Sequence, residues 1–246
     1  MLRLVKYDLR RNRDQIWIAF VVLILAQLGI WISAGVSNWG NEPMLILYIT
    51  SYSILGTILT VQACRTFNYN LKSYHRRLLP LKSVSTVLSP LLMYLILLLG
   101  VSALAAIHFG LYMVLAPDVI PIHTWIVPVV GLLQLLWTAC FVFIFLMLGI
   151  TVARSLRFKG RVWIGIAVFL LVLNGFSLME NWLIGEDNNS FVNALQFQMT
   201  DQGTVSEGGI TVSIDVYTFS SILVEVSFAL IIIYIITQLM NRRVES

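Results

Sequence analysis

Two acidic residues lie inside long apolar stretches of the sequence, where a charged side chain is unfavourable. Glu180 lies near the end of the stretch 162–184, and Glu225 lies inside the stretch 217–240. In the core of a bilayer a carboxylate costs at least about 2.5 kcal/mol, so it is normally partnered, protonated or turned toward a water-filled cavity. Neither stretch contains a Lys or Arg that could pair with it. With Asn174 as a hydrogen-bonding neighbour, these residues predict a polar translocation path; the alternative is that Glu180 lies at the membrane surface.

Other chemistry is missing from the sequence. It has no G-x-x-x-x-G-K-[ST] loop for nucleotide phosphates, no H-E-x-x-H, no G-x-S-x-G and no Cys/His cluster with metal-ligand spacing. Cys64 and Cys140 lie apart in apolar stretches, where we expect them to act as small apolar side chains. His75, His108 and His123 lie in segments that the predicted topology keeps apart. We therefore expect that the chain is not an enzyme and binds no metal or cofactor by itself.

The elements that must position the acidic residues are transmembrane helices. The chain is 59% hydrophobic and 11% charged, whereas soluble domains carry about 25% charged residues. A span needs roughly 20 mostly apolar residues, and in hydrocarbon the backbone must satisfy its own hydrogen bonds, so each span is expected to be an α-helix. The fold class predicted is therefore an all-α polytopic membrane protein with six transmembrane helices. Their expected ranges are about 15–35, 43–66, 85–116, 125–153, 162–184 and 217–240.

The basic residues predict the orientation of these helices. All 16 Lys and Arg residues lie in alternate connecting segments, namely 1–13, 65–82, 154–161 and 242–243. The loops on the other side carry only acidic charges, namely Glu42, Asp118, Glu186, Asp187, Asp201, Glu207 and Asp215. Lys and Arg mark cytoplasmic loops, so both termini are expected in the cytoplasm. The net charge of +4 is explained by this asymmetry and does not indicate nucleic-acid binding.

The segment 1–14 is predicted to be an amphipathic helix that precedes the transmembrane domain, 15–246. Its apolar face has Leu2, Val5 and Leu9, and its basic face has Arg3, Lys6, Arg10 and Arg13. This pattern is typical of a helix that lies in the membrane interface with its basic side toward anionic headgroups. The alternative is a positive tail that only sets the topology.

Small residues four positions apart indicate faces where helices pack closely, within the chain or with a second subunit. They include Gly29 with Ser33, Gly56 with Thr60, and Ala106 with Gly110.

The cytoplasmic segment 67–84, FNYNLKSYHRRLLPLKSV, combines aromatic, basic and apolar residues. A short helix in its first half would end before Pro80, because the residue before a proline disfavours the α conformation. A solvated linker does not need this composition, so we expect a docking surface. Its candidate residues are Phe67, Tyr74, Arg76, Arg77, Leu79, Pro80 and Leu81.

The outer loop, 185–216, is the largest segment outside the predicted spans. Near its end Ile210, Val212, Ile214 and Val216 alternate with mostly polar residues. Such a period of two is typical of a β-strand. Together with LQFQMTD before it, the pattern predicts a small β-hairpin on the outer surface.

The order of these features resembles the membrane-spanning permease subunit of a type-2 ABC transporter, the class of many bacterial exporters. The resemblance covers the amphipathic segment, six helices with both ends inside, and the stretch LPLKSVSTVLSPLL, which enters the third span. It implies that 67–82 docks on a separate cytoplasmic ATPase, which supplies ATP, and that two permease subunits associate in a bacterial cytoplasmic membrane. One departure is visible: the family often has re-entrant helices after the fifth span, whereas 195–217 here has a strand pattern.

The leading hypothesis is therefore a permease subunit that exports an amphipathic substrate, such as a peptide, an antibiotic or a lipid-like molecule. The alternative is a non-transporting membrane sensor, immunity or assembly factor that binds through its outer loop. A proton-coupled carrier, based on Glu180 and Glu225 alone, is a third hypothesis, although no inverted repeat is visible.

Overall fold

The computed structural model describes residues 2–37, 41–72, 83–115, 126–156, 160–184 and 219–241. Its helices are α1 (Leu2–Arg11), α2 (Arg13–Ser37), α3 (Asn41–Lys72), α5 (Ser83–Leu115), α6 (Ile126–Ser155), α7 (Arg161–Ile184) and α8 (Phe219–Leu239). The all-α prediction is confirmed for these residues, which contain no strand. The β-hairpin predicted within 185–216 lies outside them.

Each apolar stretch predicted from the sequence is a helix. Those long and apolar enough to cross a membrane are Arg13–Ser37, Ile46–Leu71, Val84–Leu111, Leu135–Ser155 and Arg161–Glu180. The apolar part of α8, Leu223–Leu239, is shorter. The chain is therefore a helical membrane protein, whereas the count of six spans and their orientation stay predictions.

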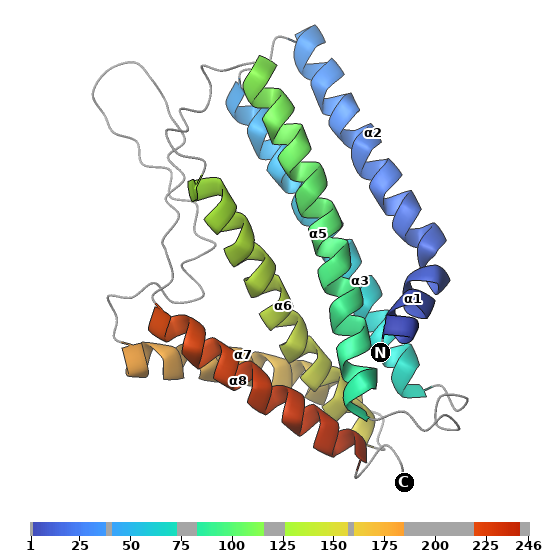
Figure 1. Ribbon diagram of the computed structural model, residues 1–246, viewed down its shortest axis with the longest axis vertical. Helices are drawn as coiled ribbons and strands as arrows, with labels where there is room; N and C mark the ends of the chain where they lie inside the picture. The colour runs from blue at the N-terminus through green and yellow to red at the C-terminus, as the bar shows by residue number, and fades with distance from the viewer. Residues whose placement is uncertain are drawn as a thin grey trace.

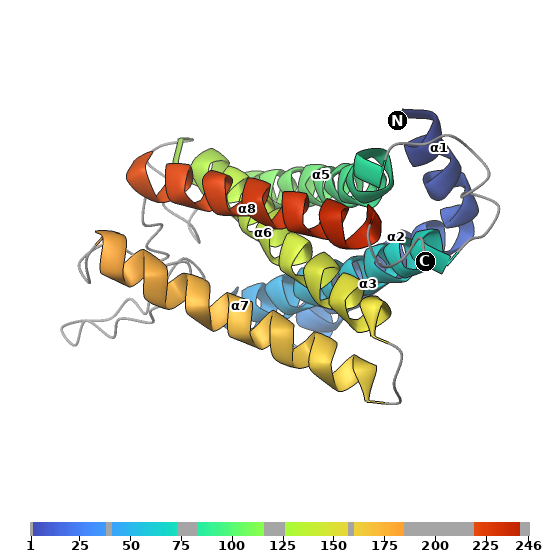
Figure 2. The same cartoon turned by 90° about the horizontal axis from the view of Figure 1, so that it is seen from below.

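The long helices do not form one parallel bundle. Helices α2, α3, α5 and α6 run along the long axis of the molecule, whereas α7 and α8 are tilted away from that axis and meet α6 near its lower end (Figure 1). Helix α6 packs against both α7 and α8. In the view from below, α6 runs obliquely from beside α8 toward the start of α7 (Figure 2). The region around α6, α7 and α8 is thus a subassembly attached to the other helices mainly through α6.

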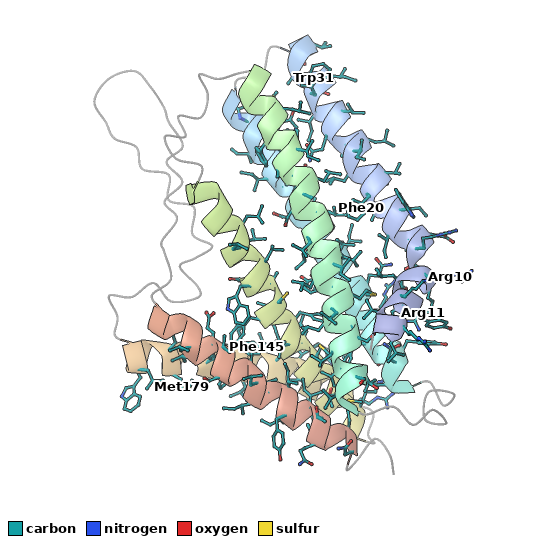
Figure 3. The ribbon with its side chains drawn as sticks, viewed as in Figure 1. Arg10, Arg11, Phe20, Trp31, Phe145 and Met179 are labelled. Atoms are coloured by element: carbon teal, nitrogen blue, oxygen red, sulfur yellow. The ribbon has the colours of Figure 1, made fainter. Side chains whose placement is uncertain are left out.

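The core lies among α3, α5, α6 and α8, and the outside is apolar. Tyr48, Phe67 and Phe143 are among the large side chains with almost no exposure. On α2, in contrast, only Leu23, Gln27 and Ala34 are buried. Apolar side chains such as Trp31 project outward from α2 (Figure 3). Extensive exposed apolar surface is unfavourable in water but suits contact with lipid.

Two close helix contacts involve glycines. Phe20 points from α2 toward α5, where a Cβ atom on Gly100 would lie 3.6 Å from its ring (Figure 3). Between α6 and α7 the approach is closer, because a Cβ atom on Gly165 would lie 2.8 Å from the Cβ atom of Ala153. Such small residues let helix backbones approach in membranes.

The predicted small-residue faces do not form these contacts. A Cβ atom on any of Gly29, Gly56 and Gly110 would meet no atom within 4 Å. Close packing within the chain is therefore not found at these three glycines, although Thr60, on the same face as Gly56, hydrogen-bonds with Tyr94 on α5 at 2.8 Å. Packing with a second subunit stays a prediction.

Candidate functional site

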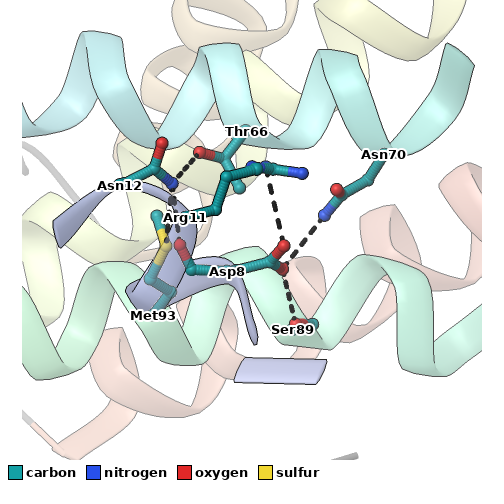
Figure 4. Close-up of polar contacts among 7 residues, drawn as sticks. All are labelled: Asp8, Arg11, Asn12, Thr66, Asn70, Ser89 and Met93. Carbon is teal, nitrogen blue, oxygen red and sulfur yellow. Dashed lines mark hydrogen bonds and ion pairs between the residues drawn. The ribbon is translucent and has the colours of Figure 1, made fainter. Parts of the chain in front are cut away.

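A buried carboxylate joins helices α1, α3 and α5. Asp8 on α1 has 0% exposure. Its Oδ2 atom accepts hydrogen bonds from Asn70 Nδ2 on α3 at 3.1 Å and from Ser89 Oγ on α5 at 3.0 Å (Figure 4). Its Oδ1 atom lies 3.5 Å from Arg11 Nη2. One side chain thus fixes α1 against α3 and α5.

Polar contacts around Asp8 also fix the break between α1 and α2. Asn12, which lies at that break, donates from Nδ2 to Thr66 Oγ1 on α3 at 2.8 Å (Figure 4). The same amide donates to the carbonyl oxygen of Asp8 at 3.0 Å. The Arg11 guanidinium lies 4.3 Å from the centre of the Tyr69 ring, a cation–π distance. The direction in which the chain turns from α1 into α2 is therefore set by side chains of α3.

Helix α1 is amphipathic, as predicted, but its apolar face packs on the protein and not on the membrane interface alone. Arg3, Lys6 and Arg10 are exposed. Val5 is buried in the protein core, and α1 packs mainly on α5. The burial of Asp8 was not predicted from the sequence, because Asp8 is a single acid in a basic segment. The available signal was its position three residues after Val5, which places it beside the buried face of the helix.

The second polar site lies between α7 and α8 and contains both predicted intramembrane acids. Glu180 on α7 is 2% exposed and Glu225 on α8 is 0% exposed. Glu180 lies four residues after Phe176 and Glu225 three residues before Phe228, and these two rings pack against each other across α7 and α8. The indole N–H of Trp137 on α6 donates to Oε2 of Glu225. The other oxygen, Oε1 of Glu225, is buried and has no hydrogen-bond partner in the part of the chain that the structure describes.

Aromatic rings pack beside these acids. The ring centroids of Phe141 on α6 and Phe176 on α7 are 4.9 Å apart. Those of Phe176 and Phe228 on α8 are also 4.9 Å apart. Phe145, which Figure 3 shows on α6, packs 4.6 Å from Phe141. The carboxyl groups therefore lie on the same helices as a buried aromatic cluster and close to it in sequence, where a negative charge is poorly solvated.

Asn174 is not part of this acid site. Its side chain is exposed, and its Nδ2 atom donates to the carbonyl oxygen of Leu170 on its own helix at 2.8 Å. Residues six apart are separated by about 120° around an α-helix, so Asn174 does not share the buried face of α7 on which Glu180 lies. The site therefore contains Glu180, Glu225 and Trp137 but not Asn174. Trp137 lies in the middle of an apolar stretch, and this position was the sequence signal that its N–H needs a buried acceptor.

The predicted docking residues fall into two groups. Phe67 lies on α3, which continues to Lys72, and it is fully buried. Its predicted place in a docking loop is therefore wrong. Phe67 and Leu71 are one turn apart and both face the core. These contacts extend α3 beyond its predicted end at residue 66. The other predicted docking residues, Tyr74, Arg76, Arg77, Leu79, Pro80 and Leu81, lie outside the described residues.

Within the described ranges, no group of three or more His, Cys, Asp or Glu residues could hold a metal ion. Cys64 and Cys140 are free thiols that pack against the core, as the sequence predicted.

No family model, curated protein or solved structure matches the chain. The fold and the two sites therefore define a class, a helical membrane protein with buried carboxylates at two helix junctions, and any narrower function is an inference from its residues.

Proposed function

We propose that the chain is the permease subunit of a type-2 ABC transporter and exports an amphipathic substrate. In this proposal it crosses the bacterial cytoplasmic membrane six times, with both termini in the cytoplasm. A separate cytoplasmic ATPase supplies the energy, and a second permease subunit completes the translocation path. Glu180 and Glu225 lie along that path.

The observation that carries the proposal is the junction at Asp8. The hydrogen bonds of Asp8 go to Asn70, near the end of α3, and to Ser89, near the start of α5. These are the helices on either side of the predicted docking segment. A movement imposed on that segment by an ATPase would therefore be transmitted to α1 as well as to α3 and α5.

The remaining docking residues have defined roles in this proposal. Tyr74, Leu79 and Leu81 supply apolar contacts to the ATPase, and Arg76 and Arg77 supply charge. Phe67 is removed from this set, since its ring is buried among the helices. It holds the end of α3 in place instead.

The test is co-purification with the ATPase encoded by a neighbouring gene. The double variant Arg76→Glu/Arg77→Glu is expected to lose at least about tenfold in recovered ATPase, because each of the two charges is reversed at the contact. The matched control is Arg242→Glu/Arg243→Glu, which reverses the same charge after α8 and should leave recovery unchanged. If no ATPase is recovered with the wild-type chain, the sensor or assembly hypothesis is favoured and the permease proposal is wrong.

A further inference from the structure

The carboxyl groups of Glu180 and Glu225 are brought to one place by the aromatic contact between α7 and α8. Glu180 lies four residues after Phe176, and Glu225 lies three residues before Phe228. The two helices run in opposite directions (Figure 1). At a rise of about 1.5 Å per residue, both carboxyl groups lie about 5 Å beyond the paired rings, on the same side.

The helices around the pair supply no positive charge to it. The sequence has no Lys, Arg or His between Arg161 and Arg242, which covers α7 and α8, and none from Ile126 to Ala153 on α6. On α5, His108 hydrogen-bonds with Tyr52 on α3 at 3.2 Å, so it faces away from the pair. Two carboxylates that share a dry site cannot both be ionised at neutral pH.

Other ionisable side chains on these helices are engaged elsewhere or are too far along the helix. On α5, the Tyr94 hydroxyl hydrogen-bonds with Thr60 on α3. On α6, Arg154 donates to Asn68 on α3 at 2.7 Å, and Cys140 packs against the core. On α8, Tyr234 is 64% exposed. None of these side chains brings a positive charge to the two glutamates.

A second observation points to what the site holds. Oε2 of Glu225 accepts from Trp137, but Oε1 of the same fully buried side chain has no hydrogen-bond partner in the described residues. A buried oxygen of this kind is satisfied when it carries a proton or accepts one from a neighbouring acid.

We propose that Glu180 and Glu225 form a proton-binding site in which the two carboxyl groups hold one proton between them. The site goes beyond the transport function proposed above and does not require an ATPase. Binding of the proton removes the repulsion between two like charges on α7 and α8. Because each of these helices packs mainly on α6 rather than on the other, their mutual contact depends strongly on that proton.

The test is a pH titration of the purified wild-type protein in lipid nanodiscs, followed by infrared difference spectroscopy. The wild-type protein is expected to show the carbonyl stretch of a protonated carboxyl group at neutral pH. Glu180→Gln and Glu225→Gln should each shift the titration of the remaining glutamate by more than about one pH unit, because strongly interacting acids titrate as a pair. Asp14→Asn, which removes an exposed acid, should leave this band unchanged.

Either of two results overturns the proposal: no protonated carboxyl group at neutral pH in the wild-type protein, or a remaining glutamate that titrates as it does in the wild type. If the Gln variants fail to fold, Trp137→Phe supplies the test. It keeps both carboxyl groups and removes the N–H donor of Glu225, so the titration must change, and an unchanged titration overturns the proposal. No step of this experiment involves the ATPase, so its result is independent of the proposed transport function.

Discussion

Gly149 on α6 lies so close to Gly165 on α7 that a Cβ atom added to Gly149 would be 2.8 Å from the carbonyl oxygen of Gly165. No side chain fits between the two backbones at this crossing. The contact lies near the end of α6 and the start of α7, and from there the two helices diverge (Figure 1). The crossing therefore positions α7, and with it Glu180, relative to α6.

Gly149→Ala and Gly165→Ala are each expected to destabilise the protein by about 1–3 kcal/mol, because the added methyl group forces two backbones apart. Unfolding by SDS titration in mixed micelles measures the change. Gly175→Ala on α7 is the matched control, since its Cβ atom would meet no atom within 4 Å, and it should be neutral or stabilising by up to about 1 kcal/mol. Equal effects of Gly165→Ala and Gly175→Ala would contradict the close crossing.

Asp8→Ala is expected to destabilise the protein by about 2–3 kcal/mol, because Asn70 and Ser89 lose their buried acceptor. The same SDS titration applies. Asp14→Ala removes an acid whose ion pair with Arg13 is exposed, and such pairs contribute about 0–1 kcal/mol. A loss no greater for Asp8→Ala than for Asp14→Ala would show that the junction of α1 with α3 and α5 contributes little.

Phe67→Ala separates a core role from a docking role. We expect a loss of about 3 kcal/mol in the free energy of unfolding, because the fully buried ring leaves a cavity. Ile58→Ala, on the same helix but 49% exposed, should have a much smaller effect. ATPase recovery, measured in parallel on folded protein, should stay unchanged. Loss of ATPase recovery with normal stability would restore Phe67 to the docking surface.

Trp137→Phe keeps an aromatic ring but removes the donor to Glu225. Hydrogen bonds between membrane helices contribute about 0.6 kcal/mol on average and up to about 1.7 kcal/mol, and we expect the upper part of this range because the acceptor is a buried carboxyl group. Trp163→Phe is the control, because its side chain is 76% exposed. In a double-mutant cycle, Trp137→Phe should lose its effect when Glu225 is already Leu, which has no acceptor for the indole N–H. Additive effects would exclude a direct bond.

The positions of the helices could be predicted from the sequence because apolar length is a direct requirement of the bilayer. The stretch 162–184, for example, corresponds to α7 (Arg161–Ile184). The end of α3 was less predictable. Tertiary contacts of Phe67 and Leu71 extend that helix past the apolar stretch, and a rule based on hydropathy contains no such contacts.

The partners of polar residues could be predicted only in part. A carboxylate in an apolar stretch is unfavourable unless it has a partner, so Glu180 and Glu225 could be predicted as site residues. The structure places both of them on the buried side of α7 and α8. Asn174 was chosen by proximity in sequence, but its side chain is exposed and bonds to its own helix. Asp8 was missed because Asn70 and Ser89 are remote in sequence, and no local pattern reveals such pairings.

The junction at Asp8 also has a consequence for the order of assembly. Asp8 precedes Asn70 by 62 residues and Ser89 by 81 residues. Synthesis proceeds from the N-terminus, so α1 leaves the ribosome long before the two residues that donate to Asp8 have been made. Until α5 has been inserted, the carboxylate of Asp8 has to stay hydrated. Helix α1 is therefore made first but can take its final place only after α3 and α5 have packed together. Docking of α1 thus requires that the first half of the chain has been assembled correctly.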